Sequence, residues 1–269
     1  MQMSRWYFLD DQSASGSLNM AYDEYIFSML EKWRRPVLRL YSFDPPAITL
    51  GYHQQFEKVL NAEAVHEDGI EVARRITGGR ALLHKNEVTY CVASLSADFD
   101  SGTDMTGSFL RISAALKRAL GSIGLAAEVS PRRSVKNSVG RGERLVSPCL
   151  ASVTRYELTI GGKKVAGSAQ RRRDGAFLQH GSILLGRGSE DIVRYLRGDW
   201  SDLKSTVTSI DDELGREIPR DAFKERLLEG FIDEFGVEFE ALELSADDRR
   251  AIEEMAAVKK AEFVNLVRK

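Results

Sequence analysis

Two adjacent glycines, Gly161 and Gly162, constrain the fold of this chain more than any other short feature, because they separate two strand-like runs. The runs are YELTI before them and KKVAGSA after them. A pair of glycines between such runs is typical of a two-residue β-hairpin turn. A second turn, Arg-Asp-Gly at 173–175, leads into AFLQHGSILL at 176–185. The sequence therefore predicts a meander of strands with antiparallel pairing.

Further strands and helices are predicted on both sides of this meander. VLRLYSF at 37–43 is short, bounded by prolines and apolar on both faces, which is typical of a largely covered strand. Other strands are predicted at 47–51, 70–75, 88–94 and 125–129, with a glycine-containing turn between 70–75 and 88–94. Helices are predicted from an N-cap at Ser17, at about 105–122, and at 220–236 and 246–267 within a mainly helical part that starts at about 189.

This order of elements favours one fold class and one domain. Strands that pair as hairpins, followed by helices, indicate an α+β fold with a mixed, largely antiparallel sheet flanked by helices. A doubly wound parallel sheet is disfavoured by the same hairpins. We expect a single domain over residues 1–269.

Composition excludes several classes of protein. The chain has 269 residues, 43% of them hydrophobic, and a net charge of −2, so no overall attraction to nucleic acid or acidic membranes is expected. The N-terminal MQMSRWYFLDDQ has no apolar core, and no run approaches the ~20 apolar residues of a membrane span. Two cysteines in a chain of 269 residues do not form a disulfide framework, which is typical of a protein from a reducing compartment. We therefore expect a soluble, cytoplasmic protein.

The segment from Arg74 to His84, RRITGGRALLH, is the first candidate for a binding site. Its two glycines allow a ligand to approach the backbone closely, and the loop's N–H groups can receive a carbonyl or phosphate oxygen. On spacing alone, a hairpin turn with solvated arginines explains the segment equally well. The glycine spacing fits neither a Walker loop nor a dinucleotide fingerprint.

RRITGGRALLH resembles the RRxTGGRAVxH signature of the lipoate–protein ligase and octanoyltransferase superfamily. The resemblance extends, in the same order, through SGSLNMAYDE (15–24), FDPPAITLGYHQ (43–54), NEVTYCV (86–92), YELTIGGKKVAGSAQ (156–170) and LQHGSILL (178–185). It implies an α+β fold of the biotin/lipoate–protein ligase catalytic type.

Within the superfamily, the chain resembles the transferase class whose nucleophile is a cysteine on the loop before the hairpin. Pro148-Cys149-Leu150 matches that class. Ligases usually read TGGGAV, whereas this chain has Arg80 in place of the third glycine. Ligases also have a Gly-Asn pair further on, where this chain has Glu87-Val-Thr-Tyr90. The helical remainder after LQHGSILL is short for the additional C-terminal domain of many bacterial ligases. No cysteine occurs at 175–181, which disfavours the other octanoyltransferase class.

Cys149 is the candidate nucleophile and Lys164 its activating cation. A lone cysteine is more often a small buried apolar residue, the interpretation we keep for Cys91 in VTYCVAS. A free thiol with a pKa of about 8.5 is mostly protonated at neutral pH, and a nearby ammonium lowers that pKa and stabilises a developing oxyanion. Lys164 matches the family's lysine before the Val-Ala-Gly-Ser run. Strand alternation places it opposite Val165, with Lys163 solvated.

The resemblance also assigns a substrate-binding wall, made of the arginine–glycine loop and of small residues on the strands around the second turn. The assigned residues are Arg75, Thr77, Gly78, Gly79, Arg80, His84, Gly167, Ser168, Ala169, His180 and Gly181. For the two histidines, a structural hydrogen-bonding role stands beside proton transfer. No cluster of His, Cys and carboxylates has ligand spacing, so no metal site and no cofactor are predicted.

The segment 130–148 is long, without helical or strand periodicity, and basic. It carries Arg132, Arg133, Lys136, Arg141 and Arg144 against a single acid, Glu143. A solvated loop and a docking surface for an acidic acyl carrier protein both account for it. Nucleic acid is a poorer explanation, because no aromatic or motif context supports it.

The resemblance implies transfer of an octanoyl group from acyl carrier protein to a lysine of a lipoyl domain, through a thioester on Cys149. The acceptor is the glycine cleavage H protein or a 2-oxoacid dehydrogenase E2, and the sequence does not choose between them. One alternative is an ATP-dependent lipoate–protein ligase acting through lipoyl-AMP, with Cys149 a bystander. Another is a non-catalytic acyl-binding module. Consumption of Mg-ATP distinguishes the ligase from the transferase. Absence of turnover with any donor identifies the binding module.

Overall fold

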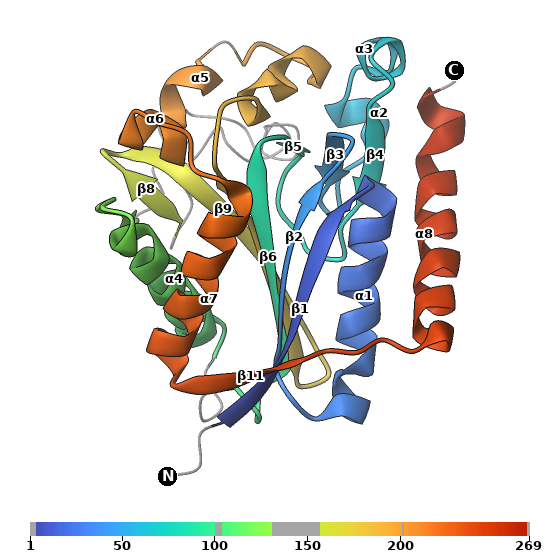
Figure 1. Ribbon diagram of the computed structural model, residues 1–269. Helices are drawn as coiled ribbons and strands as arrows, with labels where there is room; N and C mark the ends of the chain where they lie inside the picture. Colours follow the sequence, from blue (N-terminus) through green and yellow to red (C-terminus); the bar gives the residue numbers. More distant parts are fainter. Residues whose placement is uncertain (1–3, 100–103, 131–156, 201, 268–269) are drawn as a thin grey trace.

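Two β-sheets organise the computed structural model, which describes residues 4–99, 104–130, 157–200 and 202–267 (Figure 1). The larger sheet has eight strands in the order β11-β1-β2-β6-β10-β9-β8-β7. These strands are β1 (Ser4–Ala14), β2 (Val37–Phe43), β6 (Glu87–Leu95), β7 (Glu128–Val129), β8 (Leu158–Ile160), β9 (Lys163–Arg173), β10 (Ala176–Leu184) and β11 (Val237–Ala241). β1 is parallel to β2 and β11, and the further neighbours are antiparallel. The predicted mixed, largely antiparallel α+β class is confirmed.

The smaller sheet has the order β4-β3-β5, formed by β3 (Ala47–Leu50), β4 (Glu71–Arg74) and β5 (Leu82–His84). β4 is parallel to β3, and β5 is antiparallel to it. The prediction that strands at 70–75 and 88–94 flank one turn is therefore wrong. β5 lies between them, and β4 and β6 belong to different sheets. The arginine–glycine segment accordingly connects two strands of the smaller sheet.

Helices cover both faces of the larger sheet (Figure 1). One face is covered by α4 (Met105–Ser122) and α7 (Arg220–Phe235), and the other by α1 (Gly16–Trp33), against which α8 (Ala246–Val267) packs. The shorter helices are α2 (Phe56–Val59), α3 (Ala62–Glu67), the 3₁₀ helix η4 (Ser189–Tyr195), α5 (Leu203–Thr206) and α6 (Ile210–Leu214). No helix in the described ranges is both long and apolar enough to cross a lipid bilayer.

The central strand β6 shows why the sheet needs helices on both sides. Val88, Tyr90 and Val92 pack into the apolar cluster that α4 and α7 cover. Cys91 and Ala93 point the other way, into the cluster under α1. Since alternate residues of a strand face opposite sides, a strand buried on both faces reads as one continuous apolar run.

Several predicted elements are confirmed. Every residue of β2 is buried, as the apolar residues on both its faces predict. α4 has the predicted bounds. Gly161 and Gly162 have φ angles of 55° and 78° and join β8 to β9 as an antiparallel hairpin. Positive φ at both positions of a two-residue turn is the conformation that glycine adopts without steric cost.

Other predicted boundaries are wrong. The N-cap of α1 is Ser15, not Ser17, and the Ser17 hydroxyl and backbone N–H both bind the carboxylate of Glu71 instead. The strand at 125–129 is reduced to Glu128–Val129. The C-terminal part, predicted as mainly helical, contains β11, which pairs with the unpredicted strand β1.

Candidate active site

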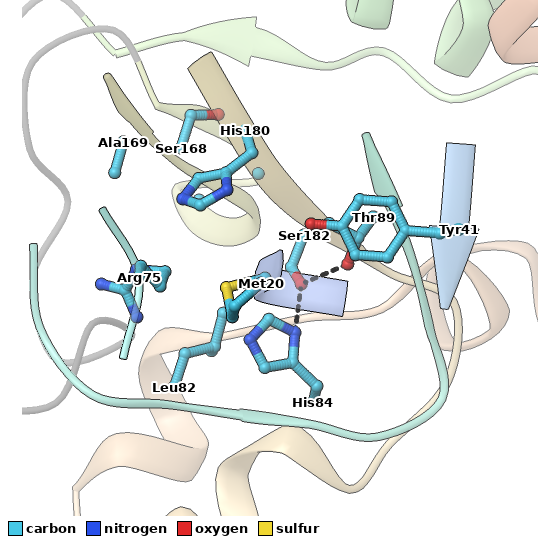
Figure 2. Close-up of a pocket in the computed structure, with 12 residues that line it drawn as sticks. Met20, Tyr41, Arg75, Leu82, His84, Thr89, Ser168, Ala169, His180 and Ser182 are labelled. Carbon is cyan, nitrogen blue, oxygen red and sulfur yellow. Dashed lines mark hydrogen bonds between the residues drawn. The ribbon is translucent and has the colours of Figure 1, made fainter. Parts of the chain in front are cut away.

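A narrow cavity opens between the arginine–glycine loop (residues 75–81), α1 and the strands β6, β9 and β10 (Figure 2). Its volume is about 30 Å³. Residues predicted for the substrate wall that line it are Arg75, His84, Gly167, Ser168, Ala169, His180 and Gly181. Residues that line it without having been predicted are Met20, Tyr41, Leu82, Thr89 and Ser182. The structure brings Arg75 of the loop together with residues of β9 and β10, whereas the predicted wall residues Thr77, Gly78, Gly79 and Arg80 do not line this cavity.

Arg75 holds the arginine–glycine loop from the inside. Its guanidinium is buried and donates to the carbonyl and hydroxyl oxygens of Thr49, at 2.9 and 2.8 Å. It also donates to the carbonyl oxygens of Gly78, at 3.1 Å, and Arg80, at 2.9 Å. A planar donor group with several N–H bonds suits this task better than a flexible ammonium. The alternative that the arginines of this loop are all solvated is therefore wrong for Arg75.

The loop and the strands approach each other closely where glycines occur. A Cβ atom on Gly51 would lie 2.1 Å from the carbonyl oxygen of Gly79, and Gly79 itself has a φ of 96°. A Cβ atom on Gly181 would lie 2.6 Å from both the carbonyl oxygen of Gly167 and the hydroxyl of Ser168. Only glycine fits the contacts at Gly51 and Gly181, and the positive φ favours glycine at Gly79; of the three, Gly181 lines the cavity.

His180 links the cavity wall to the loop through Thr77. Its Nδ1 lies 2.7 Å from Oδ2 of Asp23, and its Nε2 lies 2.7 Å from the hydroxyl of Thr77. Burial lowers the pKa of His180 below its ordinary value, and this outweighs the opposite effect of Asp23. The neutral imidazole then donates from Nδ1 to Asp23, and Nε2 accepts from Thr77. Both ring nitrogens are thus engaged in a structural hydrogen-bond relay.

Asp23 is the centre of this relay and was not predicted as a site residue. It also accepts from Nη1 of Arg39 and from the hydroxyl of Tyr41, each at 2.8 Å. Burial raises the pKa of Asp23, but the hydrogen bond from His180 and the charge of Arg39 outweigh burial and leave that pKa below its ordinary value. A sequence signal exists: Asn19 and Asp23 share a helix face with the buried Ile26 of α1. Polar residues on a buried face indicate a paired network.

His84 belongs to a second buried polar cluster, around Glu87. The Glu87 carboxylate lies 3.0 Å from Nδ1 of His84 and accepts from the hydroxyls of Thr89, at 2.6 Å, and Ser182. Nε2 of His84 lies 2.8 Å from the hydroxyl of Thr49, which Arg75 also contacts. As for His180, the histidine is held from both sides, so the predicted structural hydrogen bonds are present.

Lys164 is fully buried on β9 and forms an ion pair with Glu157, with 2.5 Å between Nζ and Oε1. Its carbonyl accepts from the N–H of Thr208, so residues 207–208 cover the strand at this point. Lys163 is exposed, as predicted, whereas Lys164 and Val165 are both buried despite the alternation of β9. Lys164 precedes Gly167 on the same strand, although it does not itself line the cavity.

Cys149 lies outside the described residues, as do the basic residues at 132–144. Cys91 is buried among apolar residues of the α1 cluster. Burial raises the pKa of its thiol well above the ordinary value, and the charge of Asp23 adds to this. Such a thiol is protonated and unreactive, in agreement with the predicted packing role. No group of three or more His, Cys, Asp or Glu side chains in the described ranges could hold a metal ion.

Comparisons with known proteins narrow the chemistry of this site. A family model described as the lipoyl protein ligase A/B catalytic domain matches residues 15–232. The octanoyltransferase LipM of Moorella thermoacetica is 34% identical over 96% of this chain and 96% of its own length. The octanoyltransferase LipM of Clostridioides difficile is 32% identical over 98% and 99%. Among solved structures, the bipartite lipoate protein ligase of Thermoplasma acidophilum superposes with a TM-score of 0.77 at 23% identity, over 97% and 94% of the two chains. The last likeness shows the fold.

Proposed function

Since this chain belongs to the lipoyl protein ligase A/B catalytic domain family, we propose that it transfers octanoyl groups in protein lipoylation, with Cys149 as nucleophile and Lys164 as its cation. The observation that carries the proposal is the placement of the buried Lys164 on the same strand as Gly167–Ala169, which line the cavity. We infer that the transferred group is octanoyl from the octanoyltransferases that match this chain over nearly their full length. The acceptor is a lysine of a lipoyl domain.

The first step is formation of an acyl-enzyme. The sulfur of Cys149 attacks the carbonyl carbon of an octanoyl thioester on the carrier protein, and a tetrahedral intermediate forms. Its collapse breaks the bond to the carrier's sulfur, which leaves as a thiol with the proton that Cys149 gives up. The octanoyl group is then held as a thioester on Cys149.

The second step transfers the acyl group to nitrogen. The neutral amine of the acceptor lysine attacks the thioester carbonyl, a C–N bond forms, and the bond to the Cys149 sulfur breaks. The amine proton returns to that sulfur. The thioester energy drives both steps, so no nucleotide is consumed.

Lys164 is suited to assist both steps because its amino group is buried beside the carboxylate of Glu157. A carboxylate partner such as Glu157 favours the charged form of a buried ammonium. An ammonium close to the thiol favours the thiolate and stabilises negative charge on the carbonyl oxygen. We assign the arginine–glycine loop and the small residues at 167–169 to the wall of the acyl slot, and His84 and His180 to its support.

The test is intact mass after incubation with octanoyl–acyl carrier protein, without nucleotide. Wild type is expected to gain one octanoyl group, which hydroxylamine removes and an apo lipoyl domain accepts. Cys149→Ala is expected to gain none. The matched control is Cys91→Ala, which removes the other thiol and is expected to acylate like wild type. An unacylated protein that modifies the lipoyl domain only with Mg-ATP and lipoate is a ligase, and that result contradicts the proposal.

A further inference from the structure

The cavity is narrow for the chain that it is proposed to hold. Its volume of about 30 Å³ is room for one or two water molecules. An octanoyl group has eight carbons, so a lining side chain that withdraws gives the acyl group more room along this cavity.

Most lining side chains are held in place by hydrogen bonds or are too small to release space. Arg75, His84 and His180 are each bonded on both sides, and Tyr41 donates to Asp23. The remaining polar side chains are those of Thr89 and Ser182, bonded to Glu87, and of Ser168, bonded to Tyr90. Gly167, Ala169 and Gly181 have little or no side chain to withdraw.

Two apolar side chains are left, Met20 and Leu82. Each packs into an apolar cluster, Leu82 of β5 into that of the smaller sheet and Met20 into that under α1, but Leu82 is branched. Met20 lies on the buried face of α1 and projects among the lining residues, beside Leu82 and His84 (Figure 2). Its side chain is unbranched, with three rotatable bonds, and a thioether fills and vacates irregular space easily.

We propose that Met20 is the specificity-determining residue of the acyl slot: its side chain occupies the space that the acyl chain takes, and the extent to which it withdraws sets the preferred chain length. The inference rests on the proposed function. Met20→Ala removes the three outer non-hydrogen atoms of the side chain, so the slot gains room for about two methylenes. Each further buried methylene is worth about a fourfold gain in binding. The preference for decanoyl over octanoyl is therefore expected to rise by about fifteenfold.

Two variants and one control test this. Met20→Ala opens the slot, and Met20→Leu keeps the volume but replaces the flexible chain by a branched one, so the ratio of octanoyl to hexanoyl transfer is expected to fall severalfold. Leu30→Ala is the matched control, because Leu30 is equally buried on α1 but does not line the cavity. It is expected to lose stability without changing the chain-length profile.

The measurement is intact mass with hexanoyl, octanoyl, decanoyl and dodecanoyl carriers, together with calorimetric binding of free octanoic and decanoic acids. Folding of each variant is checked by circular dichroism. Unchanged profiles in folded Met20→Ala and Met20→Leu, or the same shift in Leu30→Ala, would overturn the inference, as would wild type that binds neither acid. If the acids bind but no carrier acylates wild type, the proposed function fails, and the binding profile of the Met20 variants still decides the role of Met20.

Discussion

Replacing Asp23 by alanine is expected to lower the free energy of unfolding by about 3–5 kcal/mol, because it breaks a buried ion pair on one side only. Asp23 is 1% exposed and its partner Arg39 is fully buried. Removing the carboxylate leaves the guanidinium in the interior with half of its compensating charge. The hydration that Arg39 lost on folding is then no longer offset.

The magnitude follows from the groups that Asp23 satisfies. Besides Arg39, the hydroxyl of Tyr41 and Nδ1 of His180 both donate to it. Each buried donor left without an acceptor costs about 1–3 kcal/mol. The losses at Arg39, Tyr41 and His180 are not additive, because Arg39 and its neighbours can rearrange toward Asp11. The expected total is therefore the value for one broken buried ion pair, about 3–5 kcal/mol.

The assay is denaturant unfolding followed by circular dichroism, with Asp11→Ala as the matched control. Asp11 binds the same guanidinium, at 2.6 Å from Nε, but its side chain is 18% exposed. Water can replace it, so the expected loss is about 1 kcal/mol. Equal losses in the two variants would refute the argument from burial, and so would a loss below about 1 kcal/mol in Asp23→Ala.

Three further predictions concern pH, packing and thiol reactivity. Burial holds the pKa of His180 below its ordinary 6.5, so the unfolded chain takes up this proton at a higher pH than the folded protein does. The free energy of unfolding is therefore expected to decline as the pH falls below about 6.5, and His180→Gln is expected to flatten that part of the curve. An unaltered slope in this variant would count against a neutral His180. Gly181→Ala places a methyl 2.6 Å from the Gly167 carbonyl and is expected to cost about 1–3 kcal/mol in thermal or denaturant unfolding. Gly78→Ala meets no atom within 4 Å, and a comparable loss there would show that close packing is not the cause. In a Cys149→Ala background, Cys91 is expected to react with Ellman's reagent only on unfolding, because it is buried and its pKa is raised; rapid labelling of the native protein would contradict this.

Elements with a strong local signal could be predicted from the sequence, and elements that depend on distant partners could not. The hairpin at Gly161 and Gly162 and the helix at 105–122 follow from turn chemistry and periodicity. β1 and β11 are partly exposed and lie more than 200 residues apart in the sequence, so the apolar run Trp6–Leu9 of β1 does not indicate the strand with which it pairs. β5 has three residues, too few for a periodic pattern.

The candidate site divides in the same way. The resemblance located the loop and strand residues of the wall, since these form continuous motifs. Met20 and Asp23 lie in the matching block 15–24, but neither they nor Tyr41 could be predicted as site residues. Tertiary packing of α1 and β2 places Met20 and Tyr41 on the cavity and Asp23 in hydrogen-bond contact with Tyr41. Their residue types are also ordinary for a helix or a covered strand. Only the polar residues Asn19 and Asp23 on the buried face of α1 offer a signal.

The position of β11 has a consequence for how the chain is made. β1 leaves the ribosome well before one of its two neighbours, β11, which follows it by more than 200 residues. Until residue 241 has emerged, the N–H and C=O groups on that side of β1 have no strand to bind, and an open strand edge is a site for unwanted association. Nascent chains shorter than this are therefore the ones in which we expect chaperones to bind the N-terminal strand, and release is expected once β11 closes the edge.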